Sequence, residues 1–193
     1  MSRLDLVVGP NGAGKSTFVE FVLAGLRPGV PFVNADVIAA ALWPDDAMQH
    51  AYDASDAAAR ARDELLSRGE AFIAETVASH ESKIELVQRA KDAGYHVHLL
   101  VIAVPEALAV ERVAARVASG GHDVPEDKIR SRYQRLWQVV VQMIERSDSA
   151  EVFDNTGERP RTVATFVAGD VVGQPRWPTW TPGELVTRWP ASM

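Results

Sequence analysis

The sequence of 193 residues contains no cysteine. This absence excludes disulfide bonds, zinc sites with cysteine ligands and a catalytic cysteine nucleophile. Long apolar runs are missing as well, because runs such as Leu99 to Val104 are far too short to cross a bilayer. The first nine residues show no charged segment followed by an apolar signal core, so we expect a cytoplasmic protein without membrane contact.

An excess of positive charge is also missing. The chain has 20 Lys and Arg against 26 Asp and Glu, which gives a formal net charge of -6. Proteins that bind nucleic acid usually present a basic surface that neutralises phosphates, so this composition disfavours a nucleic-acid partner. Hydrophobic residues make up 47% of the chain, as in an ordinary globular protein, and the length suits one domain.

Short apolar runs alternate with longer helical patterns along the chain. The apolar runs predict strands at residues 4–9, 31–35, 71–76, 96–104 and 151–155, with an edge element at 162–171. The segments between them predict helices at residues 15–26, 36–42, 48–68, 80–93 and 106–118, and a long helix from about 126 to 146. Such alternation predicts an α/β fold with a mostly parallel sheet and helices on both faces.

Residues 174–193 differ in composition from the rest of the chain. These twenty residues contain four prolines and three tryptophans. Because prolines this dense oppose regular structure and exposed indoles are costly, we expect an irregular tail that packs on its own domain. The predicted organisation is a core at residues 1–173 followed by this tail.

The segment Gly9-Pro10-Asn11-Gly12-Ala13-Gly14-Lys15-Ser16 matches the phosphate-binding pattern G-x-x-x-x-G-K-[ST] at every required position. It follows a predicted strand and opens a predicted helix, which argues against a chance match in a glycine-rich turn. The glycines allow successive N–H groups to point at phosphates, and the helix adds its positive dipole end. Lys15 is expected to contact the β- and γ-phosphates, and the Ser16 hydroxyl to complete the coordination of Mg²⁺. We therefore predict a P-loop NTPase fold that binds ATP and Mg²⁺ through Gly9, Asn11, Gly12, Ala13, Gly14, Lys15, Ser16 and Thr17.

Two carboxylates stand where predicted strands end: Asp36 after the second strand, and Glu75, followed by Thr76, at the third. Ligands of such sheets bind beyond the carboxyl ends of the strands, so both carboxylates are expected near the γ-phosphate. Phosphoryl transfer to an alcohol requires a carboxylate that orients the hydroxyl and accepts its proton, and Asp36 is the candidate. Glu75 and Thr76 are expected to bind the substrate, or Glu75 to order the magnesium shell. The alternatives are a helix N-cap for Asp36 and a solvated loop residue for Glu75.

A cationic segment at about residues 112–135 interrupts the acidic chain. Two predicted helices, separated by Gly120-Gly121, carry Arg112, Arg116, Lys128, Arg130, Arg132 and Arg135. Such a helical hairpin suits a lid that closes over the triphosphate and stabilises charge on the departing phosphoryl group. We expect Arg116 and Arg132 to be catalytic, and Arg112 and His122 to contact the substrate. The alternative is a solvated face with local ion pairs.

Taken together, these segments resemble the zeta-toxin family over about residues 3–156. The resemblance rests on an ordered set of residues: 9–17, Asn34-Ala35-Asp36, Glu75-Thr76, Arg116, 120–125 and Arg132-Tyr133. It implies the fold of small-metabolite kinases, and the best-known members phosphorylate the 3′-hydroxyl of UDP-N-acetylglucosamine. By this analogy Asp36 matches the catalytic aspartate, Lys15 the P-loop lysine, Glu75 a substrate-contacting glutamate and Arg116 one of two lid arginines. The resemblance also raises an antitoxin protein as a partner, although no segment marks a surface for it.

The sequence thus predicts an ATP-dependent kinase that transfers a γ-phosphoryl group to a hydroxyl of a small molecule, with a sugar nucleotide as one acceptor. The same residues suit a kinase for nucleosides, nucleotides or another sugar. A protein of another class, a nucleotide-binding switch that transfers no phosphate, remains an alternative. An N-K-x-D motif for guanine is absent from the sequence, which disfavours a GTPase.

Overall fold

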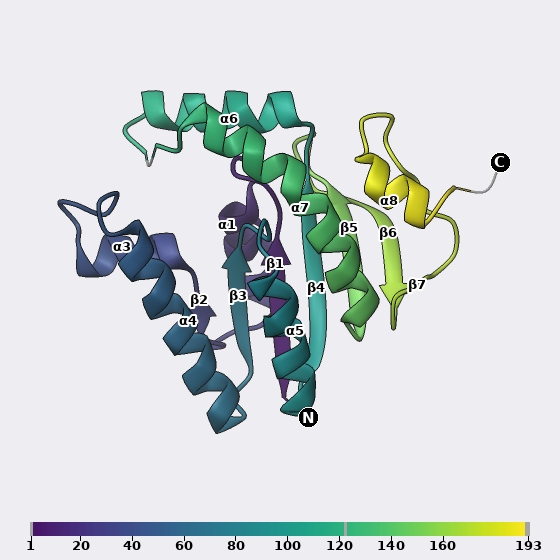
Figure 1. The fold of residues 1–193 in the computed structure, drawn as a ribbon, viewed down its shortest axis with the longest axis horizontal. Helices are drawn as coiled ribbons and strands as arrows, with labels where there is room; N and C mark the ends of the chain where they lie inside the picture. Colours follow the sequence, from purple (N-terminus) through teal and green to yellow (C-terminus); the bar gives the residue numbers. More distant parts are fainter. Residues whose placement is uncertain (1, 122, 192–193) are drawn as a thin grey trace.

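The computed structural model describes residues 2–121 and 123–191, and these residues form a seven-stranded sheet in the order β2-β3-β1-β4-β5-β6-β7 (Figure 1). The strands that pair in parallel are β1 (Arg3–Val8), β2 (Phe32–Val33), β3 (Phe72–Thr76), β4 (His96–Ala103) and β5 (Ser149–Asp154). The remaining two, β6 (Arg161–Val167) and β7 (Asp170–Val171), are antiparallel. The predicted α/β fold with a mostly parallel sheet is confirmed.

Helices cover both faces of the sheet. One face is covered by α4 (Ala51–Arg68), α5 (Ser82–Asp92) and α7 (Glu126–Arg146) (Figure 1). The helical segment that follows β1 lies behind the sheet and consists of α1 (Lys15–Phe18), η1 (Val19–Leu23) and α2 (Ala24–Leu26). Two further helices, α3 (Ala35–Leu42) and α6 (Glu106–Ala118), lie toward the carboxyl ends of the parallel strands.

Strand β1 is covered on both faces, and its side chains contribute to two apolar cores, one on each side of the sheet. Leu4, Leu6 and Val8 are fully buried in the larger core under α4, α5 and α7, whereas Val7 belongs to a smaller core with residues of α1 and η1. A strand covered on both faces requires a continuous apolar run, which the sequence shows. The register pairs Val8 with Thr76, so β1 and β3 end side by side. The P-loop and the residues that follow β3 therefore share one edge of the sheet.

Two predicted elements differ in detail from the structure. The helix expected at residues 15–26 is continuous, but its middle, η1, is a π-helix, which the apolar spacing does not distinguish from an α-helix. The edge element expected at 162–171 is a hairpin of β6 and β7, whose turn places Ala168 at φ 50° and Gly169 at φ 84°. Gly169 suits such a turn, but alanine rarely adopts a positive φ, so the sequence does not indicate that the turn includes Ala168.

The irregular tail predicted for residues 174–193 is partly wrong, because it contains a short helix, α8 (Gly183–Arg188). Pro182 occupies the position just before this helix, where a missing N–H interrupts no helical hydrogen bond. Trp189 is 5% exposed and its ring lies 4.7 Å from that of Phe166. Trp177 donates a hydrogen bond from Nε1 to the carbonyl oxygen of Trp189 at 2.8 Å. Across the described part of the chain, no helix is long and apolar enough to span a bilayer.

Candidate functional site

The P-loop connects β1 to α1 and is packed closely against neighbouring segments on two sides. Gly12 has φ 76°, and a Cβ atom there would lie 2.3 Å from the carbonyl oxygen of Ala109 in α6. Gly14 has φ 86°, and a Cβ atom there would lie 2.6 Å from Nδ2 of Asn155. These glycines therefore permit both the left-handed backbone and the close approach of neighbouring segments.

Asn155, which directly follows β5, holds the P-loop in place. Its Nδ2 donates a hydrogen bond to the carbonyl oxygen of Ala13 at 2.7 Å, and its own carbonyl oxygen accepts one from Nη1 of Arg112 at 3.0 Å. Asn155 is not among the site residues predicted from the sequence. The rule that selected Asp36 and Glu75, the search for polar residues at strand ends, would have found it at the end of the fifth strand.

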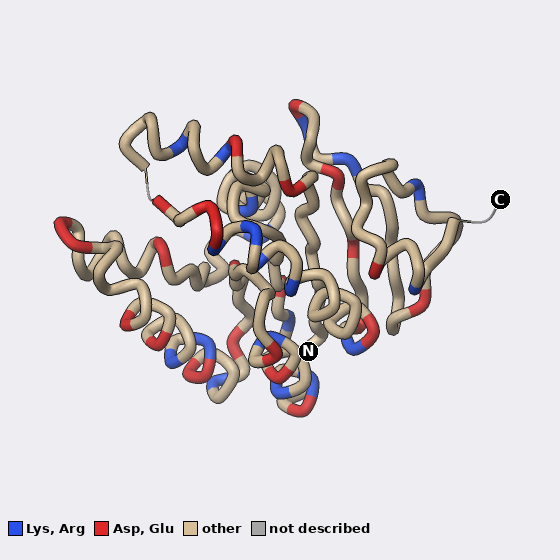
Figure 2. Tube along the Cα trace, turned by 45° about the horizontal axis from the view of Figure 1, so that its top comes forward, with Lys and Arg blue, Asp and Glu red and all other residues tan. Residues whose placement is uncertain are grey.

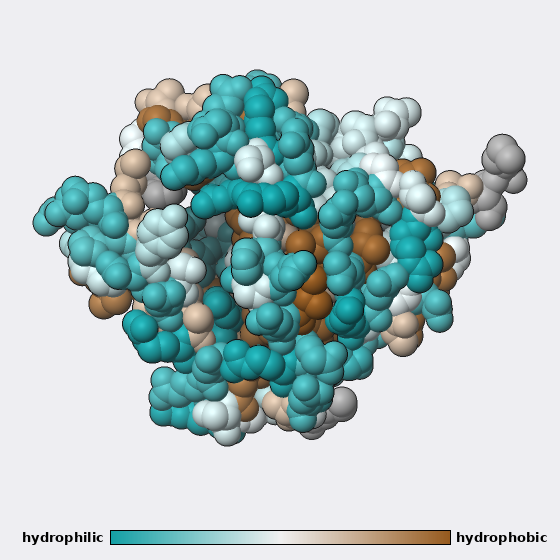
Figure 3. Space-filling view, in the orientation of Figure 1, coloured by the Kyte–Doolittle hydropathy of each residue, from teal (hydrophilic) through white to brown (hydrophobic). Residues whose placement is uncertain are grey.

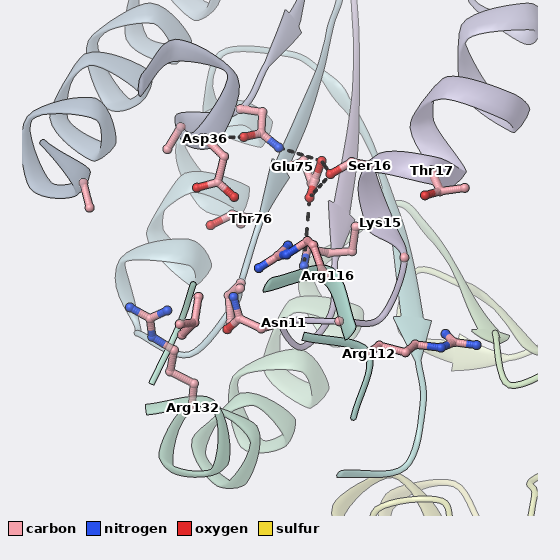
Figure 4. Close-up of a pocket in the computed structure, with 17 residues that line it drawn as sticks. Asn11, Lys15, Ser16, Thr17, Asp36, Glu75, Thr76, Arg112, Arg116 and Arg132 are labelled. Atoms are coloured by element: carbon pink, nitrogen blue, oxygen red, sulfur yellow. Dashed lines mark hydrogen bonds and ion pairs between the residues drawn. The ribbon is translucent and has the colours of Figure 1, made fainter. Parts of the chain in front are cut away.

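Glu75 lies at the centre of a hydrogen-bond network between the P-loop and β2. The Ser16 hydroxyl lies 2.9 Å and 3.1 Å from its two carboxylate oxygens, and Asn34 donates to Oε2 from Nδ2 at 2.6 Å (Figure 4). Lys15 Nζ lies 3.9 Å from Oε1 and also donates to the carbonyl oxygen of Pro10 at 3.0 Å. Glu75 is 8% exposed, so the alternative of a solvated loop residue is wrong.

Asn34, rather than Asp36, caps helix α3. Its Oδ1 accepts hydrogen bonds from the backbone N–H groups of Asp36 at 2.6 Å and Val37 at 3.2 Å. This is the usual N-cap arrangement, so the N-cap alternative for Asp36 is wrong. The Asp36 carboxylate is exposed and points into the cavity beside Glu75 and Thr76 (Figure 4).

A cavity of about 470 Å³ collects most of the predicted site residues. Its mouth is visible as a recess between the side of the molecule formed by α3 and α4 and the side formed by α6 (Figure 3). The predicted residues that line it are Asn11, Gly12, Gly14, Lys15, Ser16, Thr17, Asp36, Glu75, Thr76, Arg112, Arg116 and Arg132. The other lining residues, for which the sequence predicted no role, are Asn34, Ala35, Ala51, Val77 and Val124.

Two predicted residues that the structure describes, Ala13 and Gly9, do not line this cavity. Ala13 is fully buried beneath the P-loop and contributes its carbonyl oxygen to the bond from Asn155. Gly9 approaches β4 so closely that a Cβ atom would lie 2.2 Å from the carbonyl oxygen of Ile102. His122 lies outside the described residues.

The cavity is electrostatically suited to an anion. Burial lowers the pKa of Lys15, and Arg116 and Arg132 lower it further, whereas Glu75 and Asp36 act in the opposite direction. Basic residues lie on α6, on α7 and at the start of α1, with acidic residues between them (Figure 2). A bound polyphosphate would compensate these charges, because charge-assisted hydrogen bonds are strong in a site shielded from water.

The arginines of α6 and α7 differ in where they point. Arg116 and Arg132 reach toward the Lys15 and Asp36 side of the cavity, whereas the Arg112 guanidinium points away from Asp36 (Figure 4). Arg130 forms ion pairs with Glu106 and Glu126, both at 2.8 Å, on the protein surface. For Arg130, the alternative prediction of a solvated helix face with local ion pairs is therefore correct.

Oxygen atoms suited to magnesium meet at Ser16 and Glu75. No group of three or more His, Asp or Glu residues that could hold a metal is found in residues 2–121 and 123–191. Magnesium at nucleotide sites usually takes one or two protein oxygens and completes its shell with phosphate and water. The Ser16 hydroxyl and the buried Glu75 carboxylate, 2.9 Å apart, fit that requirement.

A second cavity of about 540 Å³ lies on the other side of Gly14. Apolar side chains of α1, η1 and β5 form much of it: Phe18, Phe21, Val22 and Phe153. Thr17 and the segment after β5 contribute the remainder: Asn155, Glu158, Arg159 and Pro160. The two cavities share Gly14 and Thr17. Together they provide one polar and one more apolar compartment on either side of the start of α1.

Comparisons with known proteins agree with this architecture. A chain of the AvrRxo1-ORF1:-ORF2 crystal structure with ATP has a TM-score of 0.72 at 20% identity, covering 89% of this chain. This chain spans 60% of that chain's length. The PezAT chromosomal toxin-antitoxin system of Streptococcus pneumoniae gives a TM-score of 0.61 at 14% identity, covering 85% of this chain and 72% of that chain. A gluconokinase from Sinorhizobium meliloti gives 0.52 at 20% identity, covering 81% and 83%. At these identities the likeness concerns the fold alone, which is the α/β fold of P-loop NTPases.

Sequence comparison gives the family. A Haemophilus influenzae protein described as uncharacterized is 31% identical over 126 residues, which cover 65% of this chain and 88% of that protein. Residues 4–139 match the AAA_33 family model, described as an AAA domain, and the chain belongs to this family.

Proposed function

We propose that this protein is an ATP-dependent kinase that transfers the γ-phosphoryl group of ATP to a hydroxyl of a small molecule. One observation carries the proposal. The Asp36 carboxylate lines the same cavity as Lys15 and Ser16 of the P-loop, and Asn34 performs the capping that would otherwise occupy Asp36. A carboxylate kept available beside a phosphate-binding loop is what transfer to an alcohol requires.

The two cavities support a nucleoside triphosphate as the donor. Its phosphates would lie at the P-loop amides and Lys15, and its base in the more apolar cavity by Phe18, Phe153 and Asn155. Asn155 connects the two regions, because its side chain holds the P-loop and the residue also lines the second cavity. Magnesium bound at Ser16 and Glu75 would neutralise charge between the β- and γ-phosphates.

Each residue of the cavity would have a separate role in the transfer step. The acceptor hydroxyl would lie at Asp36, which orients it toward the γ-phosphorus and takes its proton as the new P–O bond forms. The bond from the γ-phosphorus to the bridging oxygen breaks, and ADP leaves with the electron pair. Arg116 and Arg132 would stabilise the charge on the transferring phosphoryl group, and Lys15 would hold the phosphates in line.

UDP-N-acetylglucosamine is the acceptor that the resemblance to zeta toxins favours. Nucleosides, nucleotides and other sugars use the same catalytic residues, so an acceptor panel must separate them. The structural neighbours from the AvrRxo1-ORF1:-ORF2 complex and the PezAT system support an antitoxin-like protein as a partner within the same proposal.

The deciding variant is Asp36→Asn. We expect it to retain binding of ATP while losing about 10²–10⁴-fold in transfer to the acceptor, because the neutral amide accepts no proton. Asp45→Asn is the matched control, since Asp45 is exposed in the turn after α3 and does not line the cavity. Nucleotide binding is followed by calorimetry, and transfer by labelled ATP with the acceptor panel. If Asp36→Asn turns over ATP like the control and no acceptor is labelled, the protein is a nucleotide-binding switch instead.

A further inference from the structure

Asn34 lies between β2 and α3, lines the main cavity and is 5% exposed. Strand β2 pairs in parallel with β3, with Val33 opposite Ala74. The next residues along the two chains, Asn34 and Glu75, therefore lie side by side at the carboxyl edge of the sheet. Asn34 still has an extended backbone, at φ -140° and ψ 130°, and the helix begins with the residue that follows it. This one residue thus connects the strand to the helix that carries Asp36.

The amide group of Asn34 has a fixed orientation. Its Oδ1 accepts hydrogen bonds from the backbone N–H groups of Asp36 and Val37, and its Nδ2 donates to Oε2 of Glu75 at 2.6 Å. Rotation of the amide by half a turn would place Oδ1 against a carboxylate oxygen and Nδ2 against two N–H donors. The contact with α3 and the contact with Glu75 therefore support each other.

The contact with α3 determines where the Asp36 side chain starts. Asp36 is the second residue of α3, and its own N–H group donates to Oδ1 of Asn34 at 2.6 Å. An N-cap of this kind fixes the backbone of the first helical turn. The short Asp36 side chain extends from that turn into the cavity beside Glu75 (Figure 4). Its carboxylate is therefore placed by the cap that Asn34 provides.

The contact with Glu75 directs the Glu75 carboxylate toward the P-loop. The Ser16 hydroxyl lies 2.9 Å from the same Oε2 atom that Asn34 contacts. A hydroxyl whose oxygen binds magnesium donates its proton to another group, and Glu75 is an acceptor within reach. Residues that orient the groups around a metal in this way typically contribute about 10–100-fold in metal affinity or activity.

We propose that Asn34 is a positioning residue, whose single amide group fixes the carboxylates of Asp36 and Glu75 relative to each other. This proposal rests on the kinase function proposed above. Asn34 exchanges no proton in the reaction, and it acts by holding the proton acceptor and the carboxylate at the magnesium site in one arrangement. Misplacement of a reacting group by about 1 Å can cost about 100-fold in rate, so a shared anchor for both carboxylates matters for transfer.

Three substitutions of Asn34 separate its two contacts. Asn34→Asp and Asn34→Ser keep an oxygen that caps α3, because Asp, Asn and Ser are comparable N-caps, but both remove the donor to Glu75. Asn34→Ala removes the cap and the donor. Ser147→Ala is the matched control, since it deletes a buried hydrogen bond to the carbonyl oxygen of Met143, and Ser147 does not line the cavity.

Steady-state kinetics with labelled ATP distinguishes positioning from capping alone. We expect Asn34→Asp and Asn34→Ser to lower kcat about 10-fold or more and to leave the KM for ATP unchanged, because the P-loop still binds the nucleotide. Asn34→Ala should lower kcat further, and Ser147→Ala should leave it unchanged. If Asn34→Asp and Asn34→Ser turn over like the native protein while Asn34→Ala does not, Asn34 only caps the helix and the inference is wrong.

Magnesium binding tests the contact with Glu75 without turnover. The protein is saturated with a non-hydrolysable ATP analogue and titrated with Mg²⁺ in a calorimeter. We expect Asn34→Ser to weaken the affinity for Mg²⁺ about 10-fold or more, and Ser147→Ala to leave it unchanged. Equal affinities in Asn34→Ser and the native protein would overturn the inference. Absence of transfer to every acceptor by the native protein would instead contradict the kinase function, while this titration still decides whether Asn34 orients Glu75.

Discussion

Single residues at the P-loop are constrained by neighbours that are distant in sequence. Gly12 and Gly29 illustrate this, because both adopt a left-handed backbone, at φ 76° and 75°. A Cβ atom at Gly12 would collide with the backbone of α6, whereas a Cβ atom at Gly29 would meet nothing within 4 Å. The motif explains a glycine in the loop, but the close approach of α6 is a property of the folded chain.

We expect Gly12→Ala to destabilise the protein clearly more than Gly29→Ala. Both substitutions force alanine into a positive φ, which costs roughly 1 kcal/mol, and only Gly12→Ala adds a clash with the backbone of Ala109. Each kcal/mol lowers the melting temperature of a chain of this size by about 2–4 °C, so thermal unfolding resolves the difference. Equal melting temperatures for the two variants would show that the P-loop can move away from α6 without a loss of stability.

The helices of the lid region are fixed to the sheet by individual polar contacts. Tyr133 of α7 donates a hydrogen bond to the carbonyl oxygen of Val104, just after β4, at 3.0 Å. Its ring also lies 5.5 Å from that of Trp137. Burial, together with the nearby Glu106, raises the pKa of Tyr133 to about 12. The base of the predicted lid is therefore anchored, and movement of this region would involve residues nearer to Gly120 and Gly121.

This raised pKa predicts a loss of stability at high pH. Above pH 10 a tyrosine in the unfolded chain ionises, whereas Tyr133 in the folded protein keeps its proton until about pH 12. The unfolded state therefore binds fewer protons in this window, and the free energy of unfolding decreases as the pH rises. Tyr133→Phe should lower stability at neutral pH by about 1 kcal/mol and make its decline between pH 10 and 12 shallower.

Denaturant titrations at several pH values measure this effect. Tyr52→Phe is the control, because Tyr52 is 86% exposed and its replacement should leave the pH dependence as it is in the native protein. A Tyr133→Phe curve parallel to that of the control would contradict the assignment.

Across the entire chain, stability depends on the C-terminal segment as well as on the P-loop core. Trp189 fills the space over β6, and its Nε1 donates to the carbonyl oxygen of Gly169 at 3.2 Å. Arg188 pairs with Glu145 of α7 at 2.6 Å, which attaches α8 to the longest helix. The segment after residue 173 thus closes the side of the sheet formed by its antiparallel strands.

Trp189→Ala should lower the free energy of unfolding by about 3–5 kcal/mol, because it leaves a large cavity next to Phe166. Trp180, which is half-buried in the same segment, is the control, and Trp180→Ala should cost clearly less. Urea unfolding followed by circular dichroism measures both. An unchanged midpoint for Trp189→Ala would mean that the C-terminal segment unfolds independently of the core.

Much of the fold followed from local patterns in the sequence. The helix predicted at residues 106–118 has the same ends in the structure, because Pro105 and the apolar spacing mark it locally. The hairpin of β6 and β7 and the helix α8 were not predicted, since their signals are weak or masked by prolines. At the site, Asp36 and Glu75 were selected by their positions at strand ends, but the capping role of Asn34 and the anchoring role of Asn155 were not.

The sequence alone determined the P-loop and the parallel strands, because a glycine-rich turn, its lysine and continuous apolar runs act through neighbouring residues. Only the tertiary structure decided which side chains share a contact. Asn34 and Glu75 are 41 positions apart in the sequence and form a hydrogen bond, and so do Asn155 and Ala13, which are 142 positions apart. Hydrogen bonds and charge interactions act over a few ångströms in space. Composition and spacing along the chain do not indicate which distant residues come that close.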